Sequence, residues 1–316
     1  MRPFALVFVL FIVGLGAWLL WEKFYNLFPS SHKTFPTQVS DKLENPSPDQ
    51  PIKDSSLGSA GTVSFPSSNP SEAPSSPSRL IDYIALPLAE ARSQTPCETV
   101  RHTYYTLCYD EEHEQPRWTV HILEGERLKY GKVGRTQDFR PDPKVFTQSA
   151  QLSDYRGSGY DRGHLVPAGD FKWDSVAMSE TFYLSNMSPQ LHEFNAGIWE
   201  AVESMVRSWA RQKGRLVVYT GPVLNRVKKR VGKSRVSVPE AYYKVVYHLD
   251  EKAPSAVGFL VPHVPTTHSP LNFLVSVDSV EKHTGIDFFP ALPDDVEERI
   301  ESRLEYSRWR TNPRRR

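Results

Sequence analysis

The chain has 316 residues, of which 39% are hydrophobic and 12% aromatic, so it can bury a sizeable core in one or two domains. The formal net charge is +1, which excludes a protein that is committed as a whole to a polyanionic partner. Binding of an anion would therefore require a local basic patch.

An uncharged segment at the N-terminus, residues 3–21, reads "PFALVFVLFIVGLGAWLLW". At about 1.5 Å per residue it would span roughly 28 Å as a helix, which is close to the thickness of bilayer hydrocarbon. Trp18 and Trp21 stand where interfacial aromatic residues are expected. We predict an uncleaved membrane anchor within residues 1–29. A cleaved signal peptide is the alternative, but it requires a shorter apolar run and a small-x-small site.

Residues 30–79 contain 14 Ser and 8 Pro in 50 positions. Such a segment cannot bury enough apolar surface to offset the entropy lost on ordering. We interpret it as a disordered tether between the anchor and the remainder of the chain. A Ser/Pro-rich recognition surface is the alternative.

The charge that flanks the anchor indicates its orientation. Arg2 precedes the apolar run and is expected to stay on the inner side of the membrane. We therefore predict a single-pass protein of a bacterial inner membrane, with the folded part on the periplasmic side. The mitochondrial inner membrane is the alternative, although no Arg-rich amphipathic presequence precedes the apolar run.

Residues 80–316 have the composition of one globular domain. Runs rich in β-branched and aromatic residues predict strands, of which the last two should form an antiparallel hairpin. These runs are 101–110, 118–125, 215–224, 241–250 and 255–263. Apolar residues at a spacing of three and four predict a helix over 193–214 that Gly214 closes, and a charged helix over 294–310. Strands and helices without regular alternation indicate an α+β fold.

The chain has two cysteines, Cys97 and Cys108, which flank a short predicted strand. They could form a disulfide across a small loop, as expected in an oxidising compartment. Two unpaired cysteines in the core or at a sheet edge are the alternative. No CxxC pair is present, so a zinc site is not expected.

The segment "GSGYDRGHLVPAGD", residues 157–170, combines four glycines, two acids, an arginine and a histidine. His164 can act as a general base near neutral pH, and the glycines allow close approach of the backbone. Taken alone, a histidine in a glycine-rich loop is more often structural.

The predicted helix adds two residues to this candidate site. Asn195 lies near its start, and Glu203 follows eight residues later, so both can flank one edge of a site. Asn186 stands nine residues before Asn195. Amide and carboxylate oxygens suit a hard cation such as Mg²⁺. The alternatives are turn or cap chemistry for the two asparagines and a solvated helix face for Glu203.

These residues carry a resemblance. "DRGH", followed by "FYLSNMSPQLHEFNAGIWEAVE" and "VVYTGPV", resembles the sugar-nonspecific DNA/RNA endonucleases, which include endonuclease G. The similarity is strongest over residues 155–222 and weaker over 100–290. It implies the ββα-metal nuclease fold, with antiparallel sheets flanked by helices, and a metal-dependent endonuclease. Homodimers are common in the family, so the resemblance also implies that two copies can associate.

By this resemblance, His164 is the general base that activates water. Asn195 holds a single Mg²⁺, for which Mn²⁺ can substitute, and Glu203 orders the metal-bound waters. Water attacks phosphorus in line and the product ends carry a 5′-phosphate. Neither the base nor the 2′-hydroxyl is read, so DNA and RNA are both expected substrates.

The resemblance also implies three supporting roles, one of which has two candidate residues. Asn186 is a site asparagine near the histidine, and Arg162 supports the site or contacts phosphate. An upstream arginine stabilises the transition state, and either Arg135 or Arg140 can be that residue.

A basic run, residues 226–235, has six Lys or Arg and no acid. We expect Lys228, Lys229 and Arg230 to contact the nucleic-acid backbone. A solvated loop is the alternative. The C-terminal "RWRTNPRRR" could bind nucleic acid in the same way, or could contact anionic lipid.

Two other functions are compatible with the sequence. One is a noncatalytic nucleic-acid-binding module of the same fold, and the other is a surface adhesin or scaffold that depends on its tether. The presence of His164, Arg162, Asn195 and Glu203 together favours the nuclease.

Overall fold

The computed structural model describes residues 88–89, 96–248, 250 and 253–310. The predicted anchor and tether lie outside these residues. Within the described residues, no helix is both long enough and apolar enough to span a bilayer.

A seven-stranded sheet forms the centre of the fold, with the order β12-β11-β10-β7-β4-β3-β2. Every neighbouring pair in it is antiparallel. Its strands, in chain order, are β2 (Glu98–Arg101), β3 (Tyr105–Asp110), β4 (Gln115–Glu124), β7 (Arg215–Pro222), β10 (Ala241–His248), β11 (Ser255–Pro262) and β12 (Leu274–Val275). The predicted hairpin is confirmed, because β10 pairs with β11 along its whole length.

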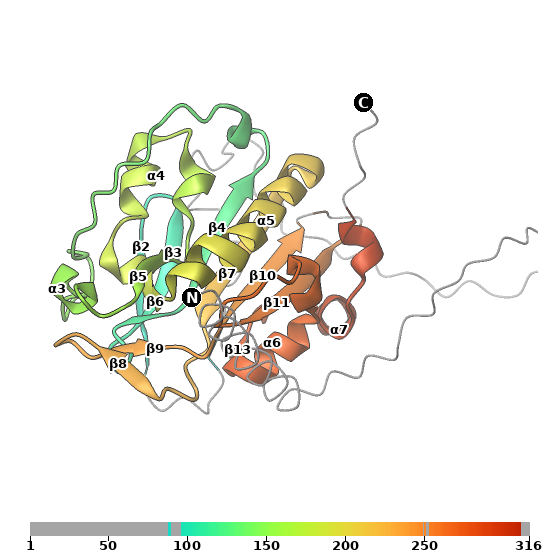
Figure 1. Cartoon of the computed structure of the whole chain (residues 1–316). Helices are drawn as coiled ribbons and strands as arrows, with labels where there is room; N and C mark the ends of the chain where they lie inside the picture. The colour runs from blue at the N-terminus through green and yellow to red at the C-terminus, as the bar shows by residue number, and fades with distance from the viewer. Residues whose placement is uncertain (1–87, 90–95, 249, 251–252, 311–316) are drawn as a thin grey trace, which may run out of the picture.

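Alternate residues of the central strands point to opposite faces, as the pleat requires. Leu216 and Val218 of β7 belong to the core that contains the long helix α5 (Glu200–Lys213). Val217 and Tyr219 belong to the core on the other face, which is covered by α6 (Val277–Thr284) and α7 (Asp294–Glu301). Figure 1 shows α5 crossing the strands, with α6 and α7 grouped at the lower right. The α+β prediction of an antiparallel sheet flanked by helices is confirmed.

Two short strand pairs and two short helices lie outside the seven-stranded sheet, and one of these pairs contains the "DRGH" motif. These are β5 (Asp161–His164) with β6 (Met187–Gln190), β8 (Lys229–Val231) with β9 (Val236–Val238), and the helices α3 (Leu152–Tyr155) and α4 (Ser175–Glu180). A further two-stranded pair joins β1 (Leu88–Ala89) to β13 (Ile286–Asp287). The "DRGH" motif is therefore a strand, β5, and not a loop.

The helix predicted over 193–214 is present, but it begins with a π-helical turn, Phe194–Trp199, before α5. Ile198, Val202, Val206 and Trp209 are buried, as the spacing predicted. Gly214 ends the helix with φ 93°, a conformation that favours glycine. π-helical turns are rare overall, but those that occur often lie at functional sites. This one contains Asn195.

The prediction of one strand over 101–110 was wrong, because a tight turn divides it into β2 and β3. The His102 amide donates to the carbonyl of Tyr105 at 2.8 Å, and Arg101 then pairs with Thr106. The His102 ring also bonds Asp142 at 2.9 Å. Contacts from a segment forty residues away thus favour the turn over a continuous strand.

The predicted helix over 294–310 was also wrong at its end, because α7 stops at Glu301. Ile300 is buried on the face of α6 and α7, whereas Trp309 packs against Trp209 of α5 at 4.9 Å between ring centroids. The chain must cross the edge of the sheet between these residues, which a straight helix cannot do. A short 3₁₀ turn, Tyr306–Trp309, follows instead.

Cys97 and Cys108 form a disulfide, which settles the alternative that the sequence left open. Their Cα atoms are 5.3 Å apart, within the usual range for a bridged pair. The bond ties the segment before β2 to the completely buried Cys108 of β3.

Candidate active site

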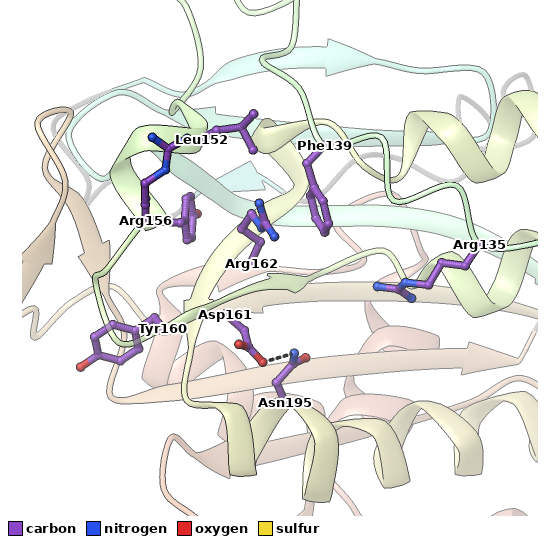
Figure 2. Close-up of a pocket in the computed structure, with 9 residues that line it drawn as sticks. Arg135, Phe139, Leu152, Arg156, Tyr160, Asp161, Arg162 and Asn195 are labelled. Carbon is purple, nitrogen blue, oxygen red and sulfur yellow. Dashed lines mark hydrogen bonds between the residues drawn. The ribbon is translucent and has the colours of Figure 1, made fainter.

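A polar pocket of about 440 Å³ lies between the β5 hairpin, the π-helical turn and the segment before α3. Figure 2 shows its wall, which carries three arginines, one acid and one amide together with aromatic rings. The lining residues are Arg135, Phe139, Leu152, Tyr155, Arg156, Tyr160, Asp161, Arg162 and Asn195. The predicted Arg135, Arg162 and Asn195 are therefore brought together from three separate elements.

His164 lies at the buried end of β5, behind the pocket wall, and is only 7% exposed. Phe139, a wall residue, and Phe182 pack edge-on against its ring, with centroids at 5.8 and 4.8 Å. Burial, followed by the positive charges of Arg135 and Arg162, lowers the pKa of His164 to about 3. The imidazole is therefore neutral near pH 7, the state in which it can accept a proton.

The glycine of the "DRGH" motif is explained by close packing within the hairpin. A Cβ on Gly163 would lie 2.2 Å from Cδ and Oε1 of Gln190, which is far inside van der Waals contact. Any side chain there would overlap the buried side chain of Gln190 on the paired strand β6. Gly157 and Gly159, just before the strand, have φ of 67° and 83°, where glycine is favoured.

Asn195 is held at the pocket wall by Asp161, the first residue of the motif. Asn195 Nδ2 donates to Asp161 Oδ2 at 2.9 Å, and His192 Nδ1 contacts the same oxygen at 2.9 Å. The bond between Asn195 and Asp161, drawn as the dashed line in Figure 2, orients the amide of Asn195. Within the described residues no donor contacts Asn195 Oδ1. An amide oxygen and an adjacent carboxylate fit a hard divalent cation such as Mg²⁺.

The structure separates the two upstream arginines. Arg135 lies over the Phe182 ring at 5.0 Å and lines the pocket, as does Arg162, which lies 4.1 Å from the Phe139 ring. Arg140 instead bonds Asp138 at 2.7 Å and Ser179 at 3.0 Å, and does not line the pocket. Of the two candidates for the upstream arginine, Arg135 therefore lines the pocket and Arg140 does not.

Asn186 is fully buried, and its amide is saturated by backbone groups. Its Oδ1 accepts from the Val166 amide at 3.0 Å, and its Nδ2 donates to the carbonyls of Val166 and Thr181. Asn186 therefore lies near the histidine, as the resemblance implied, and its side chain is engaged by backbone groups. Asn186 holds the chain just after His164, where a loss of the amide would leave three buried backbone groups without a partner.

Glu203 does not line the pocket but belongs to a buried network between α5 and the sheet. Arg207 Nη1 contacts Glu203 at 3.6 Å and Asp170 at 3.0 Å, and Asp170 also bonds His121. Burial raises the pKa of Glu203, while the charges of Lys244 and Arg207 oppose this shift. The alternative of a solvated helix face is excluded for Glu203, whose side chain is 14% exposed.

Lys244 connects this network to the motif. It is 1% exposed, and its Nζ donates to Thr220 Oγ1 at 2.8 Å and to the Leu165 carbonyl at 3.4 Å. The ammonium also lies 4.7 Å from the Trp199 ring centroid. Burial lowers the pKa of Lys244, and the Glu203 charge favours its protonated form.

Only part of the basic run approaches the pocket. Lys229 lies 4.6 Å from the ring centroid of Tyr160, a wall residue, and bonds its hydroxyl at 3.2 Å. Lys228 pairs with Glu240 at 2.5 Å, and Arg230 pairs with Glu112 at 3.4 Å. Of the three cations predicted to contact the nucleic-acid backbone, Lys229 is thus the one beside the pocket, whereas Lys228 and Arg230 each pair with an acid.

The motif, the pocket and the fold agree with a comparison against protein families. The model of the DNA/RNA non-specific endonucleases matches residues 89–295. The chain belongs to this family. The match covers every strand of the central sheet and every predicted site residue.

Individual nucleases are also similar to this chain in sequence. The zebrafish (Danio rerio) protein "Nuclease EXOG, mitochondrial" is 41% identical over 69% of this chain and 66% of its own length. Human "Endonuclease G, mitochondrial" is 37% identical over 59% of this chain and 67% of its own. The chain therefore spans about two thirds of the length of these relatives.

A solved structure of an endonuclease in this family has a similar fold. It is described as the crystal structure of the EndoG/EndoGI complex, on the mechanism of EndoG inhibition. The TM-score is 0.58 at 30% identity, with 64% of this chain and 89% of that chain covered. The resemblance to endonuclease G is thus confirmed in both sequence and fold.

Some residues of this endonuclease site were not assigned from the sequence. Asp161 had a signal, because it is the first residue of the "DRGH" motif. Lys244 also had one, as the single charge within the apolar strand "AYYKVVYH". Arg156 and Phe139 had none, because their place in the wall depends on loops between elements.

Proposed function

We propose that the chain is a divalent-metal-dependent nuclease that hydrolyses phosphodiester bonds of DNA and RNA with little sequence specificity. The observation that supports this best is the pocket wall, where Arg135, Arg162 and Asn195 meet beside a neutral buried histidine. Arginine side chains bind phosphate through paired N–H groups and do not read the bases. A polyanionic backbone is therefore the substrate that this wall suits.

Each residue of the proposed site has a separate role in the in-line hydrolysis of the phosphodiester. Arg135 and Arg162 bind the phosphate and stabilise the charge that grows on it. His164 accepts the proton of the attacking water through its neutral imidazole. The bond to the 3′ oxygen breaks, and the new end carries a 5′-phosphate. Lys229 and Tyr160 at the rim contact the neighbouring backbone or stack on a base.

Asn195 is the residue that we propose holds the metal, with Asp161 fixing the orientation of its amide. Bound there, Mg²⁺ or Mn²⁺ supplies positive charge that stabilises the phosphate and the departing oxygen. Because Glu203 does not line the pocket, we propose that it supports the site indirectly, by holding α5 in place through Arg207 and Asp170. Arg207 contacts the Glu203 carboxylate at 3.6 Å, and the charges of Lys244 and Arg207 oppose the rise in its pKa that burial causes.

The breadth of the substrate is tested by comparing single-stranded DNA, duplex DNA and RNA of several unrelated sequences with fragment 80–316. We expect cleavage of all three, with rates that vary little with sequence and with products that a 5′-phosphate-specific ligase accepts. Cleavage restricted to one sequence would contradict the proposed backbone recognition.

The two upstream arginines give a matched pair of variants. We expect Arg135→Gln to lower kcat/KM about tenfold to a hundredfold, the cost of one charge-assisted hydrogen bond. Arg140→Gln should leave kcat/KM within a few-fold and lower the melting temperature, because its partners are Asp138 and Ser179.

The pH profile adds a second readout for Arg135. Its positive charge lowers the pKa of His164, so its removal must raise that pKa. The acid limb of kcat/KM should therefore move to higher pH in Arg135→Gln and stay unchanged in Arg140→Gln. An equal shift in both variants would contradict the assignment of Arg135.

We also propose that residues 1–29 anchor the enzyme in a membrane and that residues 30–79 tether the nuclease domain, residues 80–316. Three of the relatives are named as mitochondrial nucleases, which favours a mitochondrial membrane over the bacterial periplasm. Alkaline carbonate extraction of the full chain tests this. The full chain should stay in the membrane pellet and a chain that lacks residues 1–29 should be released; release of both would contradict the anchor.

A further inference from the structure

Three carboxylates meet on the face of the sheet opposite to α5. Asp278 and Glu281 stand three residues apart on α6, so they share one side of that helix, and Glu301 is the last residue of α7. One oxygen from each lies within 4.8 Å of the other two. This acidic cluster is remote from the proposed catalytic residues, because α6 and α7 pack on one face of the sheet and Asn195 and α5 lie on the other.

Glu301 shows that this cluster is more than a group of surface acids. The residue is only 5% exposed, and its Oε1 is buried with no hydrogen-bond partner. Glu281 is half-buried, and its Oε1 accepts from the Phe288 amide at 3.0 Å. Within the described part of the chain, no Lys or Arg forms an ion pair with any of the three carboxylates. A buried carboxylate without a partner is costly, so the arrangement requires a compensating charge or a proton.

The neighbouring acids increase this cost. Burial raises the pKa of Glu301 to about 9, and the negative charges of Glu281, Glu297 and Asp278 add to the effect. Burial likewise raises the pKa of Glu281 to about 7. In the structure as it stands, the cluster therefore disfavours its own ionised state near neutral pH.

We propose that Asp278, Glu281 and Glu301 form a structural site for Ca²⁺ that joins the end of α7 to α6. Calcium binds oxygen ligands at about 2.3–2.6 Å, so two of its ligands are at most about 4.6–5.2 Å apart. The separation of the three oxygens is within this limit. Asp278, which is exposed, leaves room for water to complete the coordination. The ion would neutralise the carboxylates and give the buried Glu301 oxygen a partner.

The test is thermal unfolding of the full chain in detergent, with about 5 mM CaCl₂ or with EDTA. A site with the millimolar affinity of low-charge calcium modules should raise the melting temperature by about 3–6 °C. Glu301→Gln should melt higher than wild type in EDTA, because the amide is neutral without taking up a proton on folding, and should lose the calcium increment. Asp278→Asn, at an exposed position, should lose most of the increment without any change in the core.

Two controls separate this site from the rest of the molecule. Asp295→Asn removes an exposed acid of α7 outside the cluster and should keep the full increment. Asn195→Ala removes the proposed catalytic ligand and should also keep it, so the calcium response is independent of whether the nuclease assignment holds. The proposal is overturned if calcium leaves the wild-type melting temperature unchanged, or if Glu301→Gln and Asp278→Asn both retain the increment. Either result would leave the cluster as carboxyl groups that are protonated in the folded state.

Discussion

His164→Ala should lower kcat for plasmid cleavage by roughly 10² to 10⁴-fold, the usual contribution of a general base. The physical reason is that the lowered pKa keeps this imidazole neutral beside a pocket that binds phosphate. In the described part of the chain His192 bonds the wall residue Asp161 and His263 lies beside Tyr160, but His164 is the histidine on the motif strand and packs against Phe139. Initial rates at saturating DNA, measured with single-turnover controls, give the effect on the chemical step.

The fold of this variant is checked in parallel. His164 packs against Phe139 and Phe182, so the alanine leaves a small cavity and a modest fall in melting temperature is expected. Binding of DNA should persist, because Arg135 and Arg162 are unchanged. His268→Ala is the matched control. His268 is exposed and follows β11 in the chain, so this variant should cleave at the wild-type rate. A rate for His164→Ala within a few-fold of wild type would exclude it as the base.

Asn195→Ala should raise the Mg²⁺ concentration needed for half-maximal activity by more than about a hundredfold. Removal of a residue that only orients a metal ligand typically costs about 10- to 100-fold in metal affinity, so loss of the ligand itself should cost more. The same reasoning predicts a smaller effect for Asp161→Asn, which keeps the shape but weakens the 2.9 Å bond to Asn195. Rates measured against Mg²⁺ concentration separate the two variants.

The expected order of these effects is itself informative. Asn225→Ala removes an exposed asparagine that bonds the His283 carbonyl, and it should leave the Mg²⁺ titration unchanged. If Asp161→Asn were more damaging than Asn195→Ala, the carboxylate and not the amide would hold the ion. An unchanged titration in Asn195→Ala would place the metal elsewhere.

Much of the site could be predicted because its residues lie on a strand and a helix that patterns of neighbouring residues reveal. The "DRGH" letters place Gly163 and His164 on one short strand, and the helical spacing places Asn195 at the start of the next helix. The apolar positions of α5 were likewise readable, since Val202, Val206 and Trp209 follow one helical face. The open question about the cysteines could not be settled, because pairing depends on how the chain folds back at β2.

Other expectations failed where distant parts of the chain compete for a side chain. Arg140 is held by Ser179, 39 residues away, and Arg230 by Glu112, 118 residues away. No local pattern reveals such partners. The amphipathic pattern of 294–310 likewise cannot show that Ile300 and Trp309 pack on opposite faces of the sheet.

Incubation of supercoiled plasmid with fragment 80–316, in Mg²⁺ and in EDTA, tests the proposed nuclease activity most directly. We predict nicked, then linear, then short products in Mg²⁺, intact supercoiled plasmid in EDTA, and almost no cleavage by His164→Ala in either. Retarded but intact plasmid in Mg²⁺ would contradict the proposal and would indicate a noncatalytic nucleic-acid-binding module of the same fold.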